Sequence, residues 1–570
     1  MKPSRRFLRL ALIATAALLL YLPGLGRPAL WEPDEGRYAE IAREMYLSGD
    51  YVTPRNDYVR YFEKPPLMYW AETASIAVLG QNEFAVRLPA ALFSAGQVVV
   101  AAALADAMLG PIAALLAAVA LALSPLFFGF ARFVTLDPGL SFFMVAALAS
   151  FYAAARSEDF GSGAGRRWFR LSAAMLAMGT LTKGPVALLL AGAVALAWLV
   201  AEGRTREALR MPWISSIALF CALTVPWFVL VAERNPGFLR FFFIHEHVDR
   251  YLKATEHGWG PWFFVPIVLA GTWPWFFFVP DGVRAMSRSG ERVRSDLRFL
   301  LIWFGLIFVF FSIPRSKLGE YILPAIPALA IVAGAGMQAL LSFDAARIRR
   351  TFGWFAGINV ALSALAAAAL LIAGYRLPPA MVRDGLMIAS AVATTAVVCF
   401  AIAARGRHAR AAVFALVLGM VVAMGLASRV RRDAASLATY RNLARQASRH
   451  LGPGCVLASY RHFVQSLPFY TGFREAMVSF RGELAPFSRS PDAQASFIPN
   501  DADLSRIWAS GACMVLIADR PYLPQLFKEL NPRPVIVGCE GKKFALLNNP
   551  ASASDADCVA RANEPPPKAR

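Results

Sequence analysis

Charged and aromatic side chains are concentrated between residues 31 and 70, directly after the first apolar segment. This stretch begins WEPDEGRYAEIAREM and ends YFEKPPLMYW, and residues of both charge signs alternate in it with Trp and Tyr. Asp34 and Glu35 carry carboxylates that can act as general bases, and Lys64 carries a compact cation suited to a phosphate. A solvated loop is the plain alternative, but a spacer needs no such mixture. We therefore expect a polar reaction site here.

The same stretch predicts the element that positions these side chains. Pro33 suits the first turn of a helix, and the helix dipole favours the acidic pair that follows it. Apolar and aromatic residues recur at helical spacing until Ser48-Gly49-Asp50 stops the run. The pattern indicates an amphipathic helix suited to a membrane interface.

The composition is typical of a membrane protein. The chain has 570 residues, of which 57% are hydrophobic and only 17% are charged, with a mean hydropathy of +0.48. Soluble domains have about 25% charged residues. The net charge of +20 is carried largely by arginines clustered between apolar runs, a pattern that favours membrane topology and anionic lipid as its cause. We therefore expect no nucleic-acid partner.

We predict about thirteen membrane spans of the length that a bilayer needs. The first ends at Leu22 and is interpreted as a retained anchor, because no small-residue cleavage site precedes Trp31. Arginine clusters fall in alternate connections, which the positive-inside rule places in the cytoplasm with the basic N-terminus. An odd number of spans then puts the C-terminal region outside the cytoplasm. The other predicted spans lie near 86–108, 112–130, 139–156, 169–182, 184–201, 213–232, 262–280, 298–313, 320–341, 352–373, 382–404 and 409–428.

Hydropathy falls after residue 428, and residues 429–550 predict a small periplasmic α/β domain. Strands are predicted at CVLASY, REAMVSF, CMVLIAD and PVIVG, and helices at 434–450 and 521–530. Residues 551–570 are rich in Ala, Ser, Asp and Pro and are predicted to be disordered. If the region is periplasmic, disulfides are expected among its four cysteines, with Cys539 and Cys558 as the favoured pair. The other two are Cys455 and Cys513.

Further ionisable residues stand at the outer ends of predicted spans. Asp137 lies in TLDPGL, where an unpaired charge would be costly, although a helix cap before Pro138 is the plain alternative. Lys183 (TLTKGP) and the basic residues of PRSKLGEY could bind phosphate, or they could snorkel to lipid headgroups. A second long loop, 233–261, contains FFFIHEHVDRYLKATEHGWGPW, whose histidine spacing is not the zinc motif HExxH.

The segments WEPDEGRYAEIAREM and YFEKPPLMYW resemble the first periplasmic loop of the bacterial aminoarabinose transferases that modify lipid A. Those enzymes are relatives of the protein O-mannosyltransferases, in the GT-C class of polyprenyl-phosphate-sugar glycosyltransferases. The mannosyltransferases tend to have His before the double proline, so Lys64 favours the lipid A branch. The resemblance implies a polytopic α-helical GT-C fold, with a transmembrane catalytic domain over residues 1–428 and a first periplasmic loop over 27–85.

The resemblance also implies roles for individual residues. Asp34, Glu35 and Asp137 would be the catalytic carboxylates. A divalent metal, zinc or magnesium, would lie near Glu63 and His245, with His247 as the alternative histidine; in the plain alternative these side chains only line the entrance. The donor phosphate would be bound by basic and tyrosine side chains: Lys64, Arg37, Tyr38, Tyr61, Lys183, Arg250, Arg315, Lys317 and Tyr321.

By this resemblance the chain is expected to move 4-amino-4-deoxy-L-arabinose from undecaprenyl phosphate to a lipid A phosphate. The transfer would be an inverting displacement at the periplasmic face of the inner membrane, carried out by a monomer, and it would confer resistance to cationic peptides such as polymyxin. The same fold acting on protein hydroxyls or another envelope glycan is the nearest alternative. A transporter or flippase is the alternative of another class, but it would place ionisable residues near the bilayer midplane. Here they cluster in outer loops.

Overall fold

The computed structural model describes residues 3–157, 162–249, 258–374, 377–405, 408–549 and 551–563. Contacts divide the chain into two compact units. The predicted domain boundary after residue 428 is close to the end of the first unit. The first loop, however, was expected to belong to the transmembrane domain, and most of it packs with the C-terminal region instead. The first unit consists of Met1–Leu25, Glu63–Met68 and Arg87–Asp433, and the second of Gly26–Phe62, Tyr69–Val86 and Ala434–Arg570.

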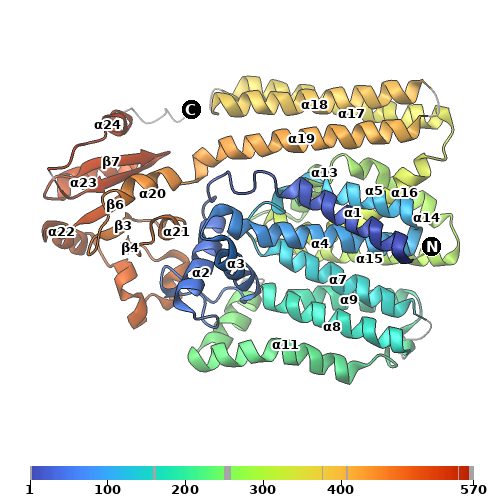
Figure 1. Ribbon diagram of the computed structural model, residues 1–570, viewed down its shortest axis with the longest axis horizontal. Coiled ribbons are helices and arrows are strands. Elements are labelled where there is room, and N and C mark those ends of the chain that lie inside the picture. The colour runs from blue at the N-terminus through green and yellow to red at the C-terminus, as the bar shows by residue number, and fades with distance from the viewer. Residues whose placement is uncertain are drawn as a thin grey trace. The chain divides into compact units, whose positions relative to one another are not determined.

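The first unit is built of helices, several of which run alongside one another (Figure 1). The apolar sequences of helices such as α4, α7 and α9 have little amphipathic periodicity, which is typical of helices surrounded by other helices or by lipid. The ends of α4 and α19 extend into the second unit. The helices are α1 (Pro3–Tyr21), α4 (Glu83–Leu109), α5 (Pro111–Ala122), α6 (Pro125–Phe130), α7 (Asp137–Ala155), α8 (Gly163–Lys183), α9 (Val186–Ala201), α10 (Thr205–Ala208), α11 (Trp213–Arg234), η1 (Arg240–Asp249), η2 (Pro261–Phe263), α13 (Phe264–Gly271), η3 (Trp275–Phe278), α14 (Val279–Ser287), α15 (Glu291–Ser312), η4 (Gly319–Ala325), α16 (Ile326–Leu340), α17 (Ala345–Ala373), α18 (Pro379–Ala404) and α19 (Ala409–Ala438).

Eight helices in the described part of the chain are long and apolar enough to cross a membrane, judged by length and composition. The number is nine if the segments Pro261–Gly271 and Trp275–Ser287, which are bent by 93°, form one broken span. Each of the thirteen predicted spans falls on helical structure, but α5 and α9 are short. The predicted span 112–130 is divided into α5 and α6. The multi-pass membrane fold is confirmed, and the count of thirteen stays a prediction.

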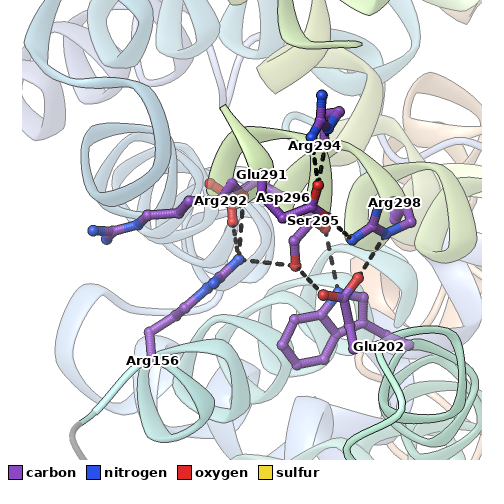
Figure 2. A network of polar contacts seen from close by, with 9 residues as sticks. Arg156, Glu202, Glu291, Arg292, Arg294, Ser295, Asp296 and Arg298 are labelled. Carbon is purple, nitrogen blue, oxygen red and sulfur yellow. Dashed lines mark hydrogen bonds and ion pairs between the residues drawn. The ribbon is translucent and has the colours of Figure 1, made fainter. Parts of the chain in front are cut away.

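Figure 2 shows a polar network that joins the ends of three helices in the first unit. Arg156, directly after α7, forms an ion pair with Asp296 of α15 and donates to the Ser295 hydroxyl at 3.1 Å. That hydroxyl donates to the carboxylate of Glu202, directly after α9, at 2.7 Å, and Arg298 donates to the same carboxylate at 2.7 Å. The ends of α7 and α9 and the beginning of α15 therefore meet at one end of the unit, as the alternating arginine clusters predicted.

The second unit contains a six-stranded sheet with the order β5-β4-β3-β6-β8-β7. Strands β3 to β6 pair in parallel, and β8 runs antiparallel to both β6 and β7. Both faces of the sheet are covered, since along β6 Leu516 and Ala518 belong to one core and Val515 and Ile517 to the other. Strands buried on both faces carry continuous apolar sequence, which is why CMVLIAD predicted a strand correctly. The α/β class of this region is confirmed.

The four predicted strands correspond to β3, β4, β6 and β7, whereas β5, β8 and the helix α22 were not predicted. The predicted helix 434–450 is divided between the end of α19 and α20. The elements of the second unit are α2 (Asp34–Ser48), β1 (Arg55–Asn56), β2 (Val59–Arg60), α3 (Leu67–Leu79, beginning in the first unit), α20 (Arg441–Ser448), β3 (Val456–Tyr460), α21 (Leu467–Thr471), β4 (Glu475–Val478), η6 (Gly482–Phe487), η7 (Pro491–Ser496), β5 (Phe497–Ile498), α22 (Asp501–Ala509), β6 (Met514–Asp519), η8 (Arg520–Tyr522), α23 (Leu523–Glu529), β7 (Val535–Glu540), β8 (Lys543–Leu547) and α24 (Ala556–Asn563).

Two disulfides stabilise the second unit. Cys539 pairs with Cys558, as the sequence favoured, and Cys455 pairs with Cys513. The prediction of disorder from residue 551 onward is wrong for residues 556–563, which form α24. Cys558 is 3% exposed and joins this helix to β7. The polar composition of the tail gave no sign of this disulfide or of the burial of Cys558.

The helix predicted after Pro33 is α2, which ends at Ser48 where Gly49 adopts a left-handed conformation with φ of 68°. Residues on all sides of the helix are buried within the protein between Glu35 and Met45, and the placement of the helix at a membrane interface stays a prediction. Even its charges are enclosed: Arg43, 2% exposed, donates to both carboxylate oxygens of Glu40 at 2.6 and 2.7 Å. The apolar spacing correctly identified one buried face of α2. The ion pair between Glu40 and Arg43 explains how the charged face can be buried as well.

Candidate active site

The first unit brings Asp137 and Lys183 together. Asp137 is the first residue of α7 and Lys183 the last residue of α8. The Lys183 ammonium donates to both carboxylate oxygens of Asp137, at 2.7 and 2.8 Å, and lies 4.5 Å from the ring centre of Tyr321. Asp137 is only 4% exposed. A carboxylate and an aromatic face thus fix the position of one ammonium group at the helix ends, and both contacts favour its charged form.

The segment that contains Lys64 packs against the same helix ends. A Cβ atom on Gly139 would lie 2.6 Å from Met68 Sδ and 3.4 Å from Thr182 Cγ2. Only glycine therefore allows Met68 to approach α7 this closely. Because Met68 follows Lys64 by one short turn of chain and Thr182 precedes Lys183, the strip 64–68 lies beside the beginning of α7 and the end of α8.

Lys64 itself lies between two carboxylates. Its Nζ is 3.3 Å from Glu246 Oε2 and 3.8 Å from Glu63 Oε2, and it donates to the Glu63 carbonyl at 3.0 Å. Glu246 comes from η1, and its side chain is 6% exposed. Sequence reasoning singled out Lys64 and Glu63, and it considered Glu246 together with the loop histidines as a suggestion of a metal site, with no link to Lys64. No motif connects residues 182 positions apart, so their contact could not be anticipated.

The other basic candidates of the first unit have different surroundings. Lys317 is 2% exposed and donates to the backbone carbonyls of Trp259, at 3.1 Å, and of Pro314. Its ammonium therefore links the backbone at Trp259 to the backbone at Pro314. Arg315 is exposed, and its carbonyl accepts a hydrogen bond from the Trp259 N–H at 3.2 Å. Arg250 lies outside the described residues.

The residues that the structure describes include no group of three or more His, Cys, Asp or Glu side chains placed to hold a metal ion. The ring of His245 is exposed and packs 5.2 Å from the Phe241 ring, whereas Glu63 lies beside Lys64. The side chain of His247 falls outside the described part. The two carboxylates near Lys64 share its ammonium, the expected divalent cation stays a prediction, and no step below depends on one.

In the second unit, Asp34 and Arg37 lie one turn apart on α2. The guanidinium of Arg37 is 3.4 Å from Asp34 Oδ1 and 3.0 Å from Glu483 Oε2. It also lies 5.9 and 6.0 Å from the ring centres of Tyr38 and Tyr61. The Asp34 side chain is 37% exposed and that of Arg37 13%. The structure thus groups three of the expected site residues, Asp34, Tyr38 and Tyr61, around the guanidinium of a fourth, Arg37.

The two neighbouring acids at the start of α2 have different surroundings. Glu35 is fully buried, and its carboxylate accepts a hydrogen bond from the Trp31 N–H at 3.0 Å. Glu35 therefore stabilises the beginning of α2, and Asp34 is the acid of this pair that solvent can reach. Glu483, from η6, was missed by the sequence analysis, because a single acid in a polar stretch carries no distinguishing pattern.

A group of buried acids connects α2 to the sheet of the second unit. Burial raises the pKa of Glu40, Glu44, Asp57 and Glu475. Glu44 accepts hydrogen bonds from the Tyr58 N–H at 2.9 and 3.0 Å, and Asp57 accepts one from the Glu475 N–H at 2.9 Å. Asp57 and Tyr58 have φ of 52° and 65°, the left-handed region that costs free energy outside glycine. These contacts fasten the first loop to β4.

Comparisons with known proteins show which sequences and folds the chain is similar to. The sequence profile of the family described as dolichyl-phosphate-mannose-protein mannosyltransferase matches residues 6–242. A relative from Enterobacter sp. (strain 638), named undecaprenyl phosphate-alpha-4-amino-4-deoxy-L-arabinose arabinosyl transferase, is 33% identical over 62% of this chain and 63% of its own length. The protein of the same name from Yersinia pestis (strain Pestoides F) is 33% identical over 57% of this chain and 58% of its own. The chain thus matches less than two thirds of the length of these relatives.

Solved structures extend the likeness over almost the whole chain. The crystal structure of ArnT from Cupriavidus metallidurans bound to undecaprenyl phosphate has a TM-score of 0.83 and 29% identity, and the match covers 95% of this chain and 98% of that one. The archaeal oligosaccharyltransferase AglB from Archaeoglobus fulgidus, at 12% identity and a TM-score of 0.51, shares the fold alone. The resemblance carried by the first loop is therefore confirmed: the chain is a homologue of the bacterial undecaprenyl phosphate-aminoarabinose transferases and has their GT-C membrane fold.

Proposed function

We propose that this chain is a glycosyltransferase that moves 4-amino-4-deoxy-L-arabinose from undecaprenyl phosphate to a phosphate of lipid A. The names of the curated relatives contain 4-amino-4-deoxy-L-arabinose and undecaprenyl phosphate, and the solved relative is bound to undecaprenyl phosphate. We place the reaction at the periplasmic face of the inner membrane. Asp137 begins α7 and the arginine-rich network follows its other end, and arginine-rich ends favour the cytoplasm.

The observation that carries the proposal is the ammonium of Lys183, fixed between the Asp137 carboxylate and the Tyr321 ring. A phosphate anion requires a cation whose position is set before the substrate arrives, because charge-assisted hydrogen bonds are strong only in good geometry. Lys64 supplies a second ammonium, on the strip that packs against the same helix ends. In this account Asp137 is a positioning residue for Lys183.

In the proposed reaction, an oxygen of the lipid A phosphate attacks C1 of the sugar while the bond from C1 to the undecaprenyl phosphate oxygen breaks. The configuration at C1 inverts, and the electron pair of the broken bond leaves with undecaprenyl phosphate. The lysine ammonium groups would stabilise the negative charge that develops there. A phosphate monoester has a second pKa of about 6, so the attacking group is already an anion near neutral pH. Asp34 would then orient the cationic amine of the sugar or neighbouring basic side chains.

The protein would act as a monomer, and its product would carry an added positive charge beside a masked phosphate. That change lowers the attraction of the cell surface for cationic peptides such as polymyxin. The second candidate is transfer of another lipid-linked sugar to a protein hydroxyl, which the match to the protein mannosyltransferase family favours.

Mass spectrometry of lipid A from cells with and without the gene tests the proposal. We expect the aminopentose on lipid A phosphate to disappear when the gene is deleted and to return when the gene is supplied again. Unchanged lipid A in a strain that otherwise makes the modified form would contradict it. A change confined to glycosylated proteins would favour the second candidate.

A further inference from the structure

An apolar cavity of about 460 Å³ lies between α7, α8, α9 and α11 of the first unit. Its wall is mainly alkyl and aromatic and includes Phe151, Leu176 and Leu196. Because it meets the C-terminal half of α7 and the N-terminal half of α8, it lies away from Asp137 and Lys183. Its volume is within the range of pockets that bind small ligands, roughly 300–1,000 Å³.

One polar group in this wall has no protein partner. Ser216 of α11 is 3% exposed and lines the cavity, and its hydroxyl has no hydrogen-bond partner among the described residues. The other serine of the wall, Ser172, donates to the Ala147 carbonyl at 2.9 Å. A buried hydroxyl left without a partner destabilises a protein unless a bound molecule satisfies it. An ester oxygen of a lipid would do so.

The residues beside this wall are basic and amphipathic. Arg170 follows the wall residue Phe169 and donates to the Ser215 hydroxyl at 2.9 Å, directly beside Ser216. The Trp213 ring packs edge-on 5.2 Å from the Phe169 ring, and tryptophan is typical of the boundary between membrane and water. Further exposed arginines lie on α8, on α10 or next to α10: Arg166, Arg167, Arg206 and Arg210.

We propose that this cavity binds an anionic phospholipid of the surrounding membrane. One acyl chain would lie between α8, α9 and α11, an ester oxygen would accept a hydrogen bond from Ser216, and the phosphate would meet Arg170 and its exposed neighbours. Basic pockets between membrane helices bind anionic lipid headgroups, and the apolar wall matches a hydrocarbon chain. Lipid binding here is independent of the proposed transfer reaction, since it uses the opposite half of the same helices.

Native mass spectrometry of the full chain tests this site, with phosphatidylglycerol or phosphatidylethanolamine of identical acyl chains added to the detergent-purified protein. We expect phosphatidylglycerol to bind about tenfold more tightly, because its headgroup has no ammonium to offset the phosphate charge that the arginines meet. Arg166→Gln, Arg167→Gln and Arg170→Gln combined should remove this preference. The matched control, Arg349→Gln with Arg350→Gln at exposed positions of α17, should retain it.

A variant that fills the cavity separates acyl-chain binding from surface charge. Gly192 lines the cavity, and a Cβ there would meet no described atom within 4 Å, so Gly192→Phe should occupy the space and abolish phosphatidylglycerol binding. Gly357→Phe on α17, where a Cβ also meets nothing within 4 Å, should leave it unchanged. Equal affinity of the wild-type protein for the two lipids, or full binding by a folded Gly192→Phe variant, would overturn the proposal. The arginine variants decide the matter if Gly192→Phe does not fold.

Discussion

At the scale of single residues, Asp137 and Lys183 form a buried ion pair, which in the proposed reaction also positions the Lys183 ammonium for the donor phosphate. The two side chains are 5% and 15% exposed, and removing one partner of a buried pair costs roughly 3–5 kcal/mol. We expect Asp137→Asn to lower the melting temperature and abolish transfer. Asp137→Asn with Lys183→Gln should recover much of the stability, because no buried charge is left alone, but no transfer. Thermal unfolding and a transfer assay measure the two effects.

The exposed Lys528 of the second unit provides the control, since Lys528→Gln should change neither the melting temperature nor the rate. Near-normal transfer by the double variant would mean that Asp137 and Lys183 only hold α7 and α8 together.

Asp34 offers a test of the acceptor. If the acceptor were a hydroxyl, Asp34 would act as a general base, because a neutral alcohol must lose its proton as it attacks. A phosphate with a second pKa of about 6 needs no such base. We therefore expect purified Asp34→Asn to lose activity through altered charge and positioning, with no recovery as the pH is raised. A pH series with the lipid-linked donor and lipid A measures this, and strong recovery at high pH would favour a hydroxyl acceptor.

At the scale of elements, Glu32 connects the chain before α2 to the beginning of α21. Its carboxylate accepts a hydrogen bond from the Ser466 N–H at 2.9 Å, and burial raises its pKa to about 7 from 4.5. The folded state therefore keeps this proton to higher pH than the unfolded state. Its stabilising contribution is complete below about pH 4.5 and is lost as the pH rises through 7, by up to about 3 kcal/mol.

Glu32→Gln cannot ionise and should remove this part of the pH dependence. We expect the variant to gain melting temperature relative to wild type between pH 5 and pH 8. Glu529→Gln, at an exposed position of α23, should follow the wild-type curve. If Glu32→Gln also parallels wild type across this range, the carboxyl of Glu32 does not titrate as described.

Sequence patterns predicted elements well wherever one local rule dominates. Pro33 and Gly49 marked both ends of α2, and the apolar runs located each membrane helix and four of the six strands of the sheet. Patterns failed where distant partners decide the structure. The charges of Glu40 and Arg43 are buried because the two side chains pair with each other. Likewise, β8 is a strand because it pairs with β6 and β7.

For the candidate site, too, the sequence identified what local motifs determine and missed what contacts between distant segments determine. Local motifs identified Asp34, Lys64, Asp137 and Lys183, and the structure joins the last two directly. The contact of Lys64 with Glu246 links remote segments that no spacing rule relates. Lys317 was chosen as a phosphate ligand on its charge alone, and the structure shows its ammonium buried and donating to backbone carbonyls, a contact that the sequence did not indicate. Residue type can suggest chemistry, whereas its environment decides whether the charge is available.

At the scale of the whole molecule, the arrangement of helix ends predicts which connections face the cytoplasm. The network of Arg156, Glu202 and Arg298 joins the arginine-rich ends of α7, α9 and α15. The two disulfides of the second unit favour an oxidising compartment for that unit. Reporter fusions after Arg350 should therefore report cytoplasm, and fusions after Ser448 should report periplasm. The same side for both would contradict the predicted number of spans.

The division into two units is the feature of the whole molecule that the sequence concealed. Hydropathy placed a boundary near residue 430, close to the end of the first unit, but it could not reveal that residues 26–62 pack with the C-terminal sheet. That association depends on contacts such as Asp57 with Glu475, 418 residues apart. Linear composition carries no information on such pairs.

The central claim is transfer of an aminosugar from a lipid-linked donor to a lipid A phosphate, and reconstitution tests it most directly. The purified protein would be placed in liposomes with undecaprenyl phosphate-linked 4-amino-4-deoxy-L-arabinose and lipid A, and the lipid A analysed by mass spectrometry. We predict the added mass of one aminopentose on a phosphate, and at least about tenfold less product with Lys64→Ala, since one charge-assisted phosphate contact contributes about 1.5–3 kcal/mol. Unmodified lipid A with folded wild-type protein, or a sugar on a hydroxyl, would contradict the account.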